Sequence, residues 1–284
     1  MDSVIEVKSL TKSYGQTRVV DGLSLTIKRG EIFAILGPNG AGKTTTVEIL
    51  EGFRRADSGE ITVLDTNPAI AGAEALAWRN RIGIVLQSTN DTAELTVREA
   101  LSHFATYYSN PRSVDDVIQL VGLAEKANDR ARTLSGGQRR RLDVGLGIIG
   151  RPELLFLDEP TTGFDPEARR AFWQLIKQLR SEGTTILLTT HYLDEAEALA
   201  DRVAVMNRGK IIEISTPALL GGRADSQATV SWRENGALQS QISEFPTEFV
   251  RKLSERLGGE IPELSIHRPT LEDIYLSMIG AADE

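Results

Sequence analysis

The stretch Gly37-Pro38-Asn39-Gly40-Ala41-Gly42-Lys43-Thr44 decides the fold of this chain. It matches the pattern G-x-x-x-x-G-K-[ST] at every fixed position. A short apolar run, Ile32–Leu36, lies before it and predicts a strand that is buried on both faces. A helical pattern follows and runs to about Gly52, a residue type common just after a helix end. Strand, glycine-rich loop and helix in this order form the context in which the pattern binds phosphate groups.

The chemistry of this loop suits a nucleoside triphosphate. Glycines let successive backbone N–H groups curl around phosphate oxygens, and the helix N-terminus adds a partial positive charge. We expect Lys43 to reach the β- and γ-phosphates, Thr44 to ligate Mg²⁺, and Thr45 to belong to the same binding set. The alternative is an ordinary glycine-rich turn between a strand and a helix, which the complete match in this context disfavours.

A pair of acidic residues follows a second predicted buried strand. The apolar run at residues 154–157 ends at Asp158-Glu159, and ligands of open α/β sheets bind at the carboxyl ends of the strands. We expect Asp158 to hold Mg²⁺ through water and Glu159 to point toward an attacking water, because phosphoryl transfer needs charge neutralisation and a positioned nucleophile. The alternative, an acidic turn before Pro160, is disfavoured by the phosphate loop upstream.

A second glycine motif, Leu134-Ser135-Gly136-Gly137-Gln138, precedes another predicted helix. Ser135 is a residue type that caps helix N-termini, and the two glycines allow a phosphate group to approach closely. The motif predicts a second anion site, with a simple helix cap as the alternative.

Strands alternate with helices along most of the chain, which predicts an α/β core with a largely parallel sheet. Further strands are predicted at residues 4–10, 23–27, 81–86, 184–190, 202–206 and 210–214. Helical patterns at 97–108, 114–121 and 136–149 indicate a helical insertion over about residues 88–152. A strand at 228–232 and helices at 246–257 and 270–279 indicate a small appended domain at residues 221–284.

The two glycine motifs and the acidic pair together resemble those of the ATP-binding cassette (ABC) ATPases. LSGGQ at 134–138 followed by LLFLDEP at 154–160 is a highly specific pairing, and the resemblance covers about residues 4–220. It implies a P-loop NTPase core at residues 1–220, with an antiparallel β subdomain and an inserted α-helical subdomain. It also implies ATP hydrolysis, with ATP and Mg²⁺ as cofactors.

The resemblance extends to single residues. Tyr14 matches the aromatic residue that stacks on adenine, Gln87 the glutamine that senses Mg²⁺ and the attacking water, and His191 the histidine that contacts the γ-phosphate. Asp165 matches a loop that crosses the dimer interface, and it also suits a helix N-cap. The alternatives are a turn tyrosine, a surface glutamine and a structural histidine. The implied sets are catalytic Lys43, Gln87, Glu159 and His191; ATP-binding Tyr14, Gly37, Pro38, Asn39, Gly40, Ala41, Gly42, Lys43, Thr44, Thr45, Ser135, Gly136, Gly137, Gln138 and Asp165; and metal-binding Thr44, Gln87 and Asp158.

The sequence departs from the family pattern in small ways. Phe164 stands where leucine is commoner, and Gly145 and Gly147 stand in a helix where alanine is usual. Each glycine is expected to cost about 1 kcal/mol of helix stability. His103 and His267 match no motif and are interpreted as structural.

The chain holds one phosphate loop and one LSGGQ. In the resembled family the LSGGQ of one subunit closes over ATP held by the phosphate loop of another, so two-fold symmetry gives two composite sites. The resemblance therefore implies a homodimer that ATP closes and hydrolysis opens.

Composition limits the partners of the chain. Its 284 residues carry a net charge of −8 and no cysteine, which disfavours nucleic-acid binding and excludes disulfides and zinc–thiolate sites. The run Arg139-Arg140-Arg141 is interpreted as a solvated helix face rather than a nucleic-acid patch. No apolar run exceeds seven residues, whereas a spanning helix needs about 20. The chain is not expected to cross a membrane alone.

Three roles for the ATPase remain open: a transporter subunit working with a separate membrane permease, a translation protein with tandem cassettes, or a DNA-repair type with a coiled coil. The chain has one cassette, and the stretch from Lys43 to Asp158 is too short for a long coiled coil or a zinc insertion. The first role is favoured, with the chain in the cytoplasm at the inner face of the cell membrane. Segments 51–60, 95–99 and 269–276 resemble the drug-, antibiotic- and lipid-exporting branch. No residue indicates the cargo.

Overall fold

The chain divides into two compact units, Met1–Ile214 and Ser215–Glu284. The computed structural model describes residues 2–85 and 94–281. The first unit contains the phosphate loop, the acidic pair and LSGGQ, and the second has a separate sheet and a separate apolar core. The division falls a few residues before the boundary at 220–221 that the sequence predicts.

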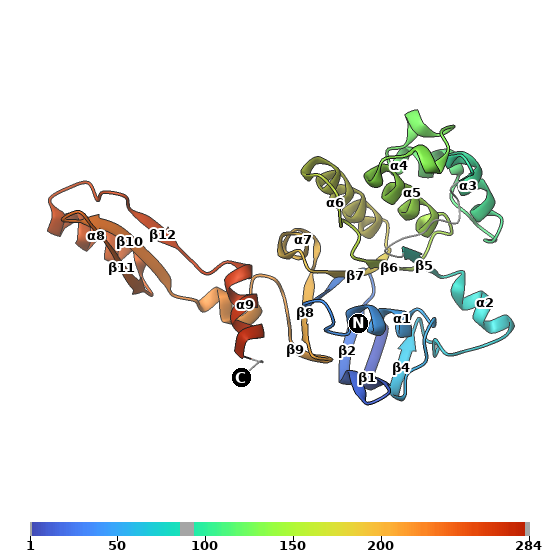
Figure 1. Cartoon of the computed structure of the whole chain (residues 1–284), viewed down its shortest axis with the longest axis horizontal. Coiled ribbons are helices and arrows are strands. Elements are labelled where there is room, and N and C mark those ends of the chain that lie inside the picture. The colour runs from blue at the N-terminus through green and yellow to red at the C-terminus, as the bar shows by residue number, and fades with distance from the viewer. Residues whose placement is uncertain (1, 86–93, 282–284) are drawn as a thin grey trace. The chain divides into compact units, whose positions relative to one another are not determined.

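A six-stranded sheet forms the centre of the first unit, with the order β5-β6-β7-β3-β8-β9 (Figure 1). Its strands are β3 (Ile32–Leu36), β5 (Ile82–Val85), β6 (Leu154–Asp158), β7 (Thr185–Thr190), β8 (Arg202–Asn207) and β9 (Lys210–Ser215). The strands from β5 to β8 pair in parallel, as predicted. Every residue of β3, β6 and β7 is buried. The carboxyl ends of these three strands meet at one edge of the sheet, where the predicted site residues follow them.

An antiparallel sheet, ordered β2-β1-β4, lies beside the central one and confirms the predicted β subdomain. It consists of β1 (Ser3–Tyr14), β2 (Thr17–Lys28) and β4 (Ser58–Val63). Its apolar residues, Ile5 and Leu23 among them, share one core cluster with Phe33 and Phe156 of the central sheet. Helix α1 (Lys43–Leu50) contributes Val47 to the same cluster. The phosphate loop and its helix are thus fixed between two sheets.

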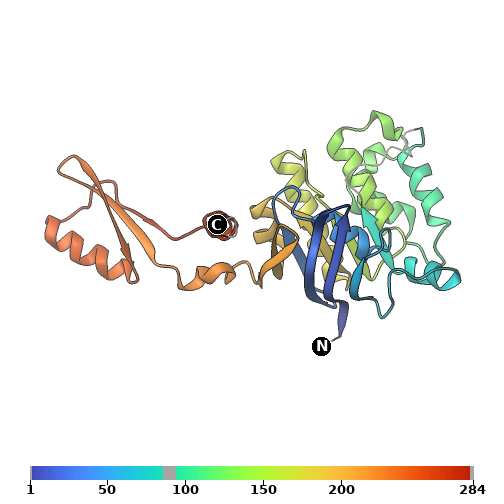
Figure 2. The same ribbon diagram turned by 60° about the horizontal axis from the view of Figure 1, so that its bottom comes forward.

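Helices α3 (Val97–Ala105), α4 (Val114–Leu120) and α5 (Gly136–Ile148) form the inserted group, together with the 3₁₀ turns Ala124–Lys126 and Ala131–Thr133. Figures 1 and 2 show the three helices gathered beside β5. The glycines of α5 are packing positions: a Cβ on Gly145 would lie 3.3 Å from Leu101 and Val117, and one on Gly147 would lie 2.6 Å from Val85 Cγ2. The expected cost in helix stability is therefore offset by close contact with neighbouring elements.

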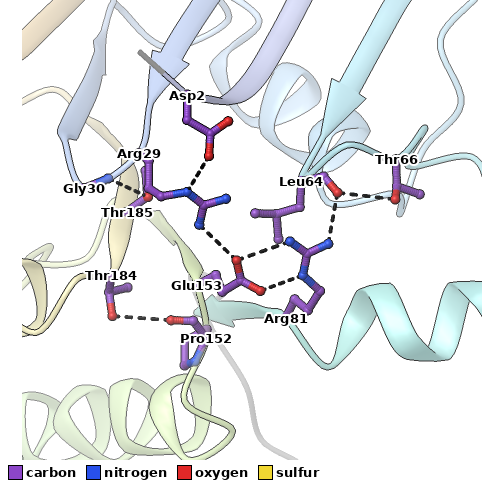
Figure 3. A network of polar contacts seen from close by, with 10 residues as sticks. All are labelled: Asp2, Arg29, Gly30, Leu64, Thr66, Arg81, Pro152, Glu153, Thr184 and Thr185. Atoms are coloured by element: carbon purple, nitrogen blue, oxygen red, sulfur yellow. Dashed lines mark hydrogen bonds and ion pairs between the residues drawn. The ribbon is translucent and has the colours of Figure 1, made fainter.

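Polar contacts tie together the amino ends of the central strands (Figure 3). Glu153, which precedes β6, accepts hydrogen bonds from Arg81 at 2.6 and 3.2 Å and from Arg29 at 2.9 Å. Arg81 precedes β5 and also donates to the Leu64 carbonyl at 3.0 Å, while Arg29 donates to Asp2 at 3.0 Å. The guanidinium of Arg81 is the main cause that lowers the pKa of Glu153. This network holds the sheet edge opposite to the one that carries the site residues.

The remaining helices of the first unit are α2 (Ala73–Arg79), α6 (Pro166–Ser181) and α7 (Leu193–Leu199). The last two follow β6 and β7, and α2 precedes β5. Neither β4 nor α2 is predicted from the sequence.

The second unit is an α+β fold, as expected. Its antiparallel sheet, ordered β11-β10-β12, consists of β10 (Ala228–Glu234), β11 (Ala237–Ser243) and β12 (Ser265–His267). Helix α8 (Pro246–Leu257) packs Leu253 and Phe249 against Val230 and Trp232 of β10. The segment Leu220–Asp225 and helix α9 (Leu271–Ala281) complete the unit. Of the helices within residues 2–85 and 94–281, none combines the length and the apolarity needed to span a lipid bilayer.

Candidate functional site

The phosphate loop runs from the end of β3 to the start of α1, as predicted. Gly42 has φ 101°, and a Cβ there would lie 2.4 Å from the Val19 carbonyl oxygen. A Cβ on Gly37 would lie 2.4 Å from the Met206 carbonyl oxygen. Gly42 needs to be glycine because of both its positive φ and the close approach of the Val19 carbonyl. Gly37 needs to be glycine because of the close approach of the Met206 carbonyl alone. The loop is therefore shaped by strands β2 and β8 on either side of it.

Lys43 is buried and its side chain folds back over the loop. Its Nζ donates hydrogen bonds to the carbonyl oxygens of Gly37 at 2.8 Å and Pro38 at 3.2 Å. It also lies 3.7 Å from Glu159 Oε1. Burial lowers the pKa of Lys43, and the carboxylates of Glu159 and Asp158 act in the opposite direction. The ammonium group thus lies between the phosphate loop and the acidic pair.

Asp158 is the last residue of β6 and is 8% exposed. Its Oδ2 accepts a hydrogen bond from Thr44 Oγ1 at 3.3 Å, and its Oδ1 accepts one from Thr189 Oγ1. The structure therefore brings together two of the three predicted metal ligands. Thr189 is absent from the predicted site, although it precedes His191 in the β7 pattern.

Glu159 lies between Lys43 and His191. Its Oε2 is 3.4 Å from His191 Nδ1, and its backbone N–H donates to the carbonyl oxygen and to Oγ1 of Thr189, each at 3.1 Å. The backbone of Glu159 has φ 45°, which few residues other than glycine adopt. Three of the four predicted catalytic residues thus form one chain of contacts. The fourth, Gln87, lies outside the described residues.

The LSGGQ motif begins α5, as predicted. Ser135 Oγ accepts a hydrogen bond from the Gln138 N–H at 3.3 Å, and Gln138 Oε1 accepts one from the Ser135 N–H at 3.0 Å. These two bonds close a capping box within the motif itself, rather than reaching the phosphate loop. Gly136 is exposed, with no atom within 4 Å of a Cβ built on it. The motif is therefore open to a ligand.

Asp165 takes the helix N-cap position that the sequence indicates. Asp165 is exposed and caps α6, accepting a hydrogen bond from the Ala168 N–H at 2.8 Å. Tyr14 ends β1 and is 43% exposed. Lys12 Nζ and the Arg54 guanidinium carbon lie 5.6 and 5.7 Å from the centre of its ring.

The interpretation of the arginine run as a solvated helix face is wrong for Arg140. This side chain is 7% exposed, and its guanidinium donates to the carbonyl oxygens of Asp158 at 2.7 Å and Pro160 at 3.0 Å. Those acceptors belong to residues 158–160, the acidic loop, which contains the acidic pair. No pattern within α5 could therefore have indicated the contact.

The stretch that carries the phosphate loop, LSGGQ and the acidic pair matches a known family. Residues 20–162 match the family model described as ABC transporter. The chain belongs to the ABC transporter family. It is 35% identical to a daunorubicin resistance ATP-binding protein of Streptomyces coeruleorubidus, over 98% of this chain and 96% of that protein. It is 42% identical to the Nod factor export ATP-binding protein I of Rhizobium sp. strain N33, over 97% of each. It is 38% identical to a linearmycin resistance ATP-binding protein of Bacillus subtilis, over 80% of this chain and 75% of that one.

Solved ABC transporter structures share the fold. A subunit of the complex cbiONQ from Clostridium perfringens has a TM-score of 0.71 and 27% identity, covering 91% of this chain and 97% of that one. A bacterial ABC transporter cassette solved as a dimer has a TM-score of 0.67 and 27% identity, covering 75% and 98%. As an ATP-binding subunit of this family, the chain binds ATP and hydrolyses it.

One buried carboxyl group near the site was not predicted to have a role. Glu51, which follows α1, is 6% exposed. Burial raises its pKa to about 8, and the charges of Asp158 and Glu48 act in the same direction. Glu51 is therefore expected to be protonated at neutral pH.

Proposed function

We propose that this ABC transporter subunit powers the export of a drug-like or lipid-like molecule through a separate membrane permease. The observation that carries the proposal is the chain of contacts Lys43–Glu159–His191 beside Thr44 and Asp158, which is suited to hydrolysis. The names of relatives in drug resistance and Nod factor export support the direction of transport. The resemblance of residues 51–60, 95–99 and 269–276 to exporters agrees with them.

In the proposed site, residues 37–45 hold the ATP phosphates through backbone N–H groups and Lys43. Tyr14 stacks on the adenine ring. The Thr44 hydroxyl and the Asp158 carboxylate, 3.3 Å apart, fit Mg²⁺, which prefers oxygen ligands and is often held by one or two side chains plus substrate phosphates. Within the described residues there is no cluster of three or more His, Cys, Asp or Glu that could hold a metal by itself. When bound, Mg²⁺ neutralises charge on the phosphates.

Glu159 is the proposed base that orients the attacking water, together with Gln87. Its carboxylate lies next to His191, whose ring is proposed to contact the γ-phosphate. The folded-back position of Lys43 supports this arrangement, because its ammonium already lies over the loop proposed to hold the phosphates. Each group thus has one role: charge neutralisation by Lys43, and positioning of the nucleophile by Glu159.

The second nucleotide contact is proposed to come from a second copy of the chain. Ser135 and Gln138 bond to each other within the motif, and Gly136 between them is exposed. The proposed contacts to the second nucleotide come from Ser135, Gly136, Gly137 and Gln138. A homodimer would place this motif and Asp165 over the ATP of the partner subunit. The dimeric structure of a related cassette supports this arrangement.

Light scattering of a Glu159→Gln variant tests the dimer and the catalytic role together. The variant is expected to bind ATP, to lose roughly a hundredfold or more in kcat, and to double its mass when ATP is added. Lys43→Ala is the control, because it removes the phosphate contact and is expected to stay monomeric with ATP. A Glu159→Gln variant that stays monomeric at high concentration with saturating ATP would contradict the dimer.

The transporter role is tested by the partner. Co-expression with the membrane protein encoded beside this chain is expected to place the chain at the inner face of the membrane and to raise its ATPase rate. Stimulation by nucleic acid instead would support the translation or DNA-repair alternative, which the net charge of −8 disfavours.

A further inference from the structure

Arg140 is the buried member of the run Arg139-Arg140-Arg141. It lies on α5, little more than one turn after Ser135. Its Nη2 donates to the Asp158 carbonyl at 2.7 Å, and its Nε donates to the Pro160 carbonyl at 3.0 Å. The two acceptors stand on either side of Glu159 in the chain.

This geometry fixes the backbone that carries Glu159. The N–H of Glu159 is held by Thr189 from β7, and the carbonyls before and after it are held by Arg140 from α5. The φ of 45° at Glu159 is a conformation that needs such support. A guanidinium can donate to two acceptors from one rigid planar group, whereas the point charge of a lysine cannot reproduce that pair.

The neighbouring arginines have other contacts. Arg141 donates to the Gly122 carbonyl at 3.1 Å, and Arg139 Nε lies 3.6 Å from Asp143. Burying a charge costs free energy unless the charge is compensated. Burial lowers the pKa of Arg140, while the carboxylates of Asp143, Asp158 and Glu195 act to raise it. Arg140 thus places against the acidic loop a buried positive charge that nearby carboxylates compensate. Arg141 instead bonds to the Gly122 carbonyl.

We propose that Arg140 is a positioning residue for ATP hydrolysis, which holds the backbone around Glu159 and so sets where its carboxylate points. The inference rests on the proposed role of Glu159 as the base. Arg140 joins the helix that begins with LSGGQ to the loop that carries Glu159, within one subunit. Arg140 itself contacts neither nucleotide nor water in this role.

The test compares Arg140→Met, Arg140→Lys, Arg141→Met and Glu159→Gln in the full-length protein. Arg140→Met is expected to lower kcat roughly tenfold to a hundredfold, because small displacements of a catalytic group are costly. Its Kd for ATP is expected to stay within about twofold of the parent, since Arg140 bonds to the acidic loop and not to the phosphate loop. Like Glu159→Gln, it should accumulate as a dimer with ATP. Arg140→Lys is expected to be intermediate in kcat, and Arg141→Met to match the parent.

Two results would overturn the inference. One is a kcat for Arg140→Met equal to that of Arg141→Met while Glu159→Gln is inactive. The other is a loss of kcat, ATP affinity and melting temperature together, which is the signature of a structural role alone. Should Arg140→Met fail to fold, Arg140→Lys decides by the same split between kcat and Kd. Full activity in Glu159→Gln would refute the proposed base, and the role of Arg140 with it.

Discussion

At the scale of single residues, Glu51 connects the site to the stability of the core. It is buried at the end of α1, and burial, followed by the charges of Asp158 and Glu48, raises the pKa of its carboxyl group. Its pKa in the folded chain is about 8, against 4.5 for the free side chain. The folded state therefore keeps a proton that the unfolded chain loses at a much lower pH.

The sign of the effect follows by linkage. Below the unfolded pKa of 4.5, the Glu51 carboxyl is protonated in both the folded and the unfolded chain, and its full contribution to stability is present. As the pH rises above 4.5 and through the folded pKa of about 8, this contribution to the free energy of unfolding is lost. Glu51→Gln removes this loss. The variant is expected to match the parent near about pH 4.5 and to exceed its free energy of unfolding by a few kcal/mol at about pH 9.

Urea titrations across this range, without nucleotide, measure the difference. Glu74→Gln is the control, because Glu74 is exposed on α2 and should show no such trend. A difference between Glu51→Gln and the parent that is constant with pH would contradict the prediction.

Motif residues could be predicted from the sequence because their spacing is local. Lys43, Thr44, Asp158 and Glu159 lie in short patterns with fixed chemistry, and the strands that precede them are recognisable as apolar runs. Arg140 could not be predicted, because its acceptors are backbone carbonyls some twenty residues away.

At the scale of elements, the contact between β5 and α5 depends on two glycines. A Cβ on Gly83 would lie 2.2 Å from the Gly147 carbonyl oxygen, which is backbone and cannot rotate away. The helix that begins with LSGGQ therefore sits as close to the central sheet as backbone atoms permit.

Gly83→Ala is expected to destabilise the first unit by about 1–3 kcal/mol, because it overpacks this contact. The melting temperature should fall by several degrees, at about 2–4 °C per kcal/mol for a unit of this size. Gly136→Ala is the control for stability, since a Cβ there meets no atom within 4 Å. An unchanged melting temperature in Gly83→Ala would show that β5 and α5 can separate freely.

Elements with a regular pattern of buried residues were mostly predicted, and exposed strands were missed; α2 was missed although it buries Ala75 and Trp78. Helix α8 matches its predicted bounds, because its apolar residues recur at helical spacing. Strand β11 was missed, since six of its seven residues are exposed and show no alternation. Strands β1 and β2 also extend beyond the predicted ranges: their far ends pair through the backbone, with Ser13 opposite Arg18.

At the scale of the whole molecule, the two units have separate cores. The main apolar cluster of the second is small: Val230, Trp232, Leu253 and Ile261, with a few half-buried neighbours. The sequence indicated the appended domain from weaker patterning beyond residue 221, and the structure supplies its sheet.

Leu253→Ala is expected to destabilise the second unit by about 2–5 kcal/mol, because it removes a buried side chain from this small core. Hydrogen exchange should speed up in β10 and α8 while the amides of α1 keep their protection. The Kd for ATP should not change, since the proposed ligands all lie in the first unit. Loss of ATP binding in this variant would show that the units are not energetically separate.

The left-handed backbone at Glu159 has a consequence for protein engineering. Glycine adopts φ values near 45° without strain, so Glu159→Gly relieves a local conformational cost of order 1 kcal/mol. A laboratory evolution campaign that rewards heat resistance alone would favour glycine at this position and would lose the carboxylate. If Glu159 is the base, as proposed, only selection that also rewards turnover would keep the strained residue in place.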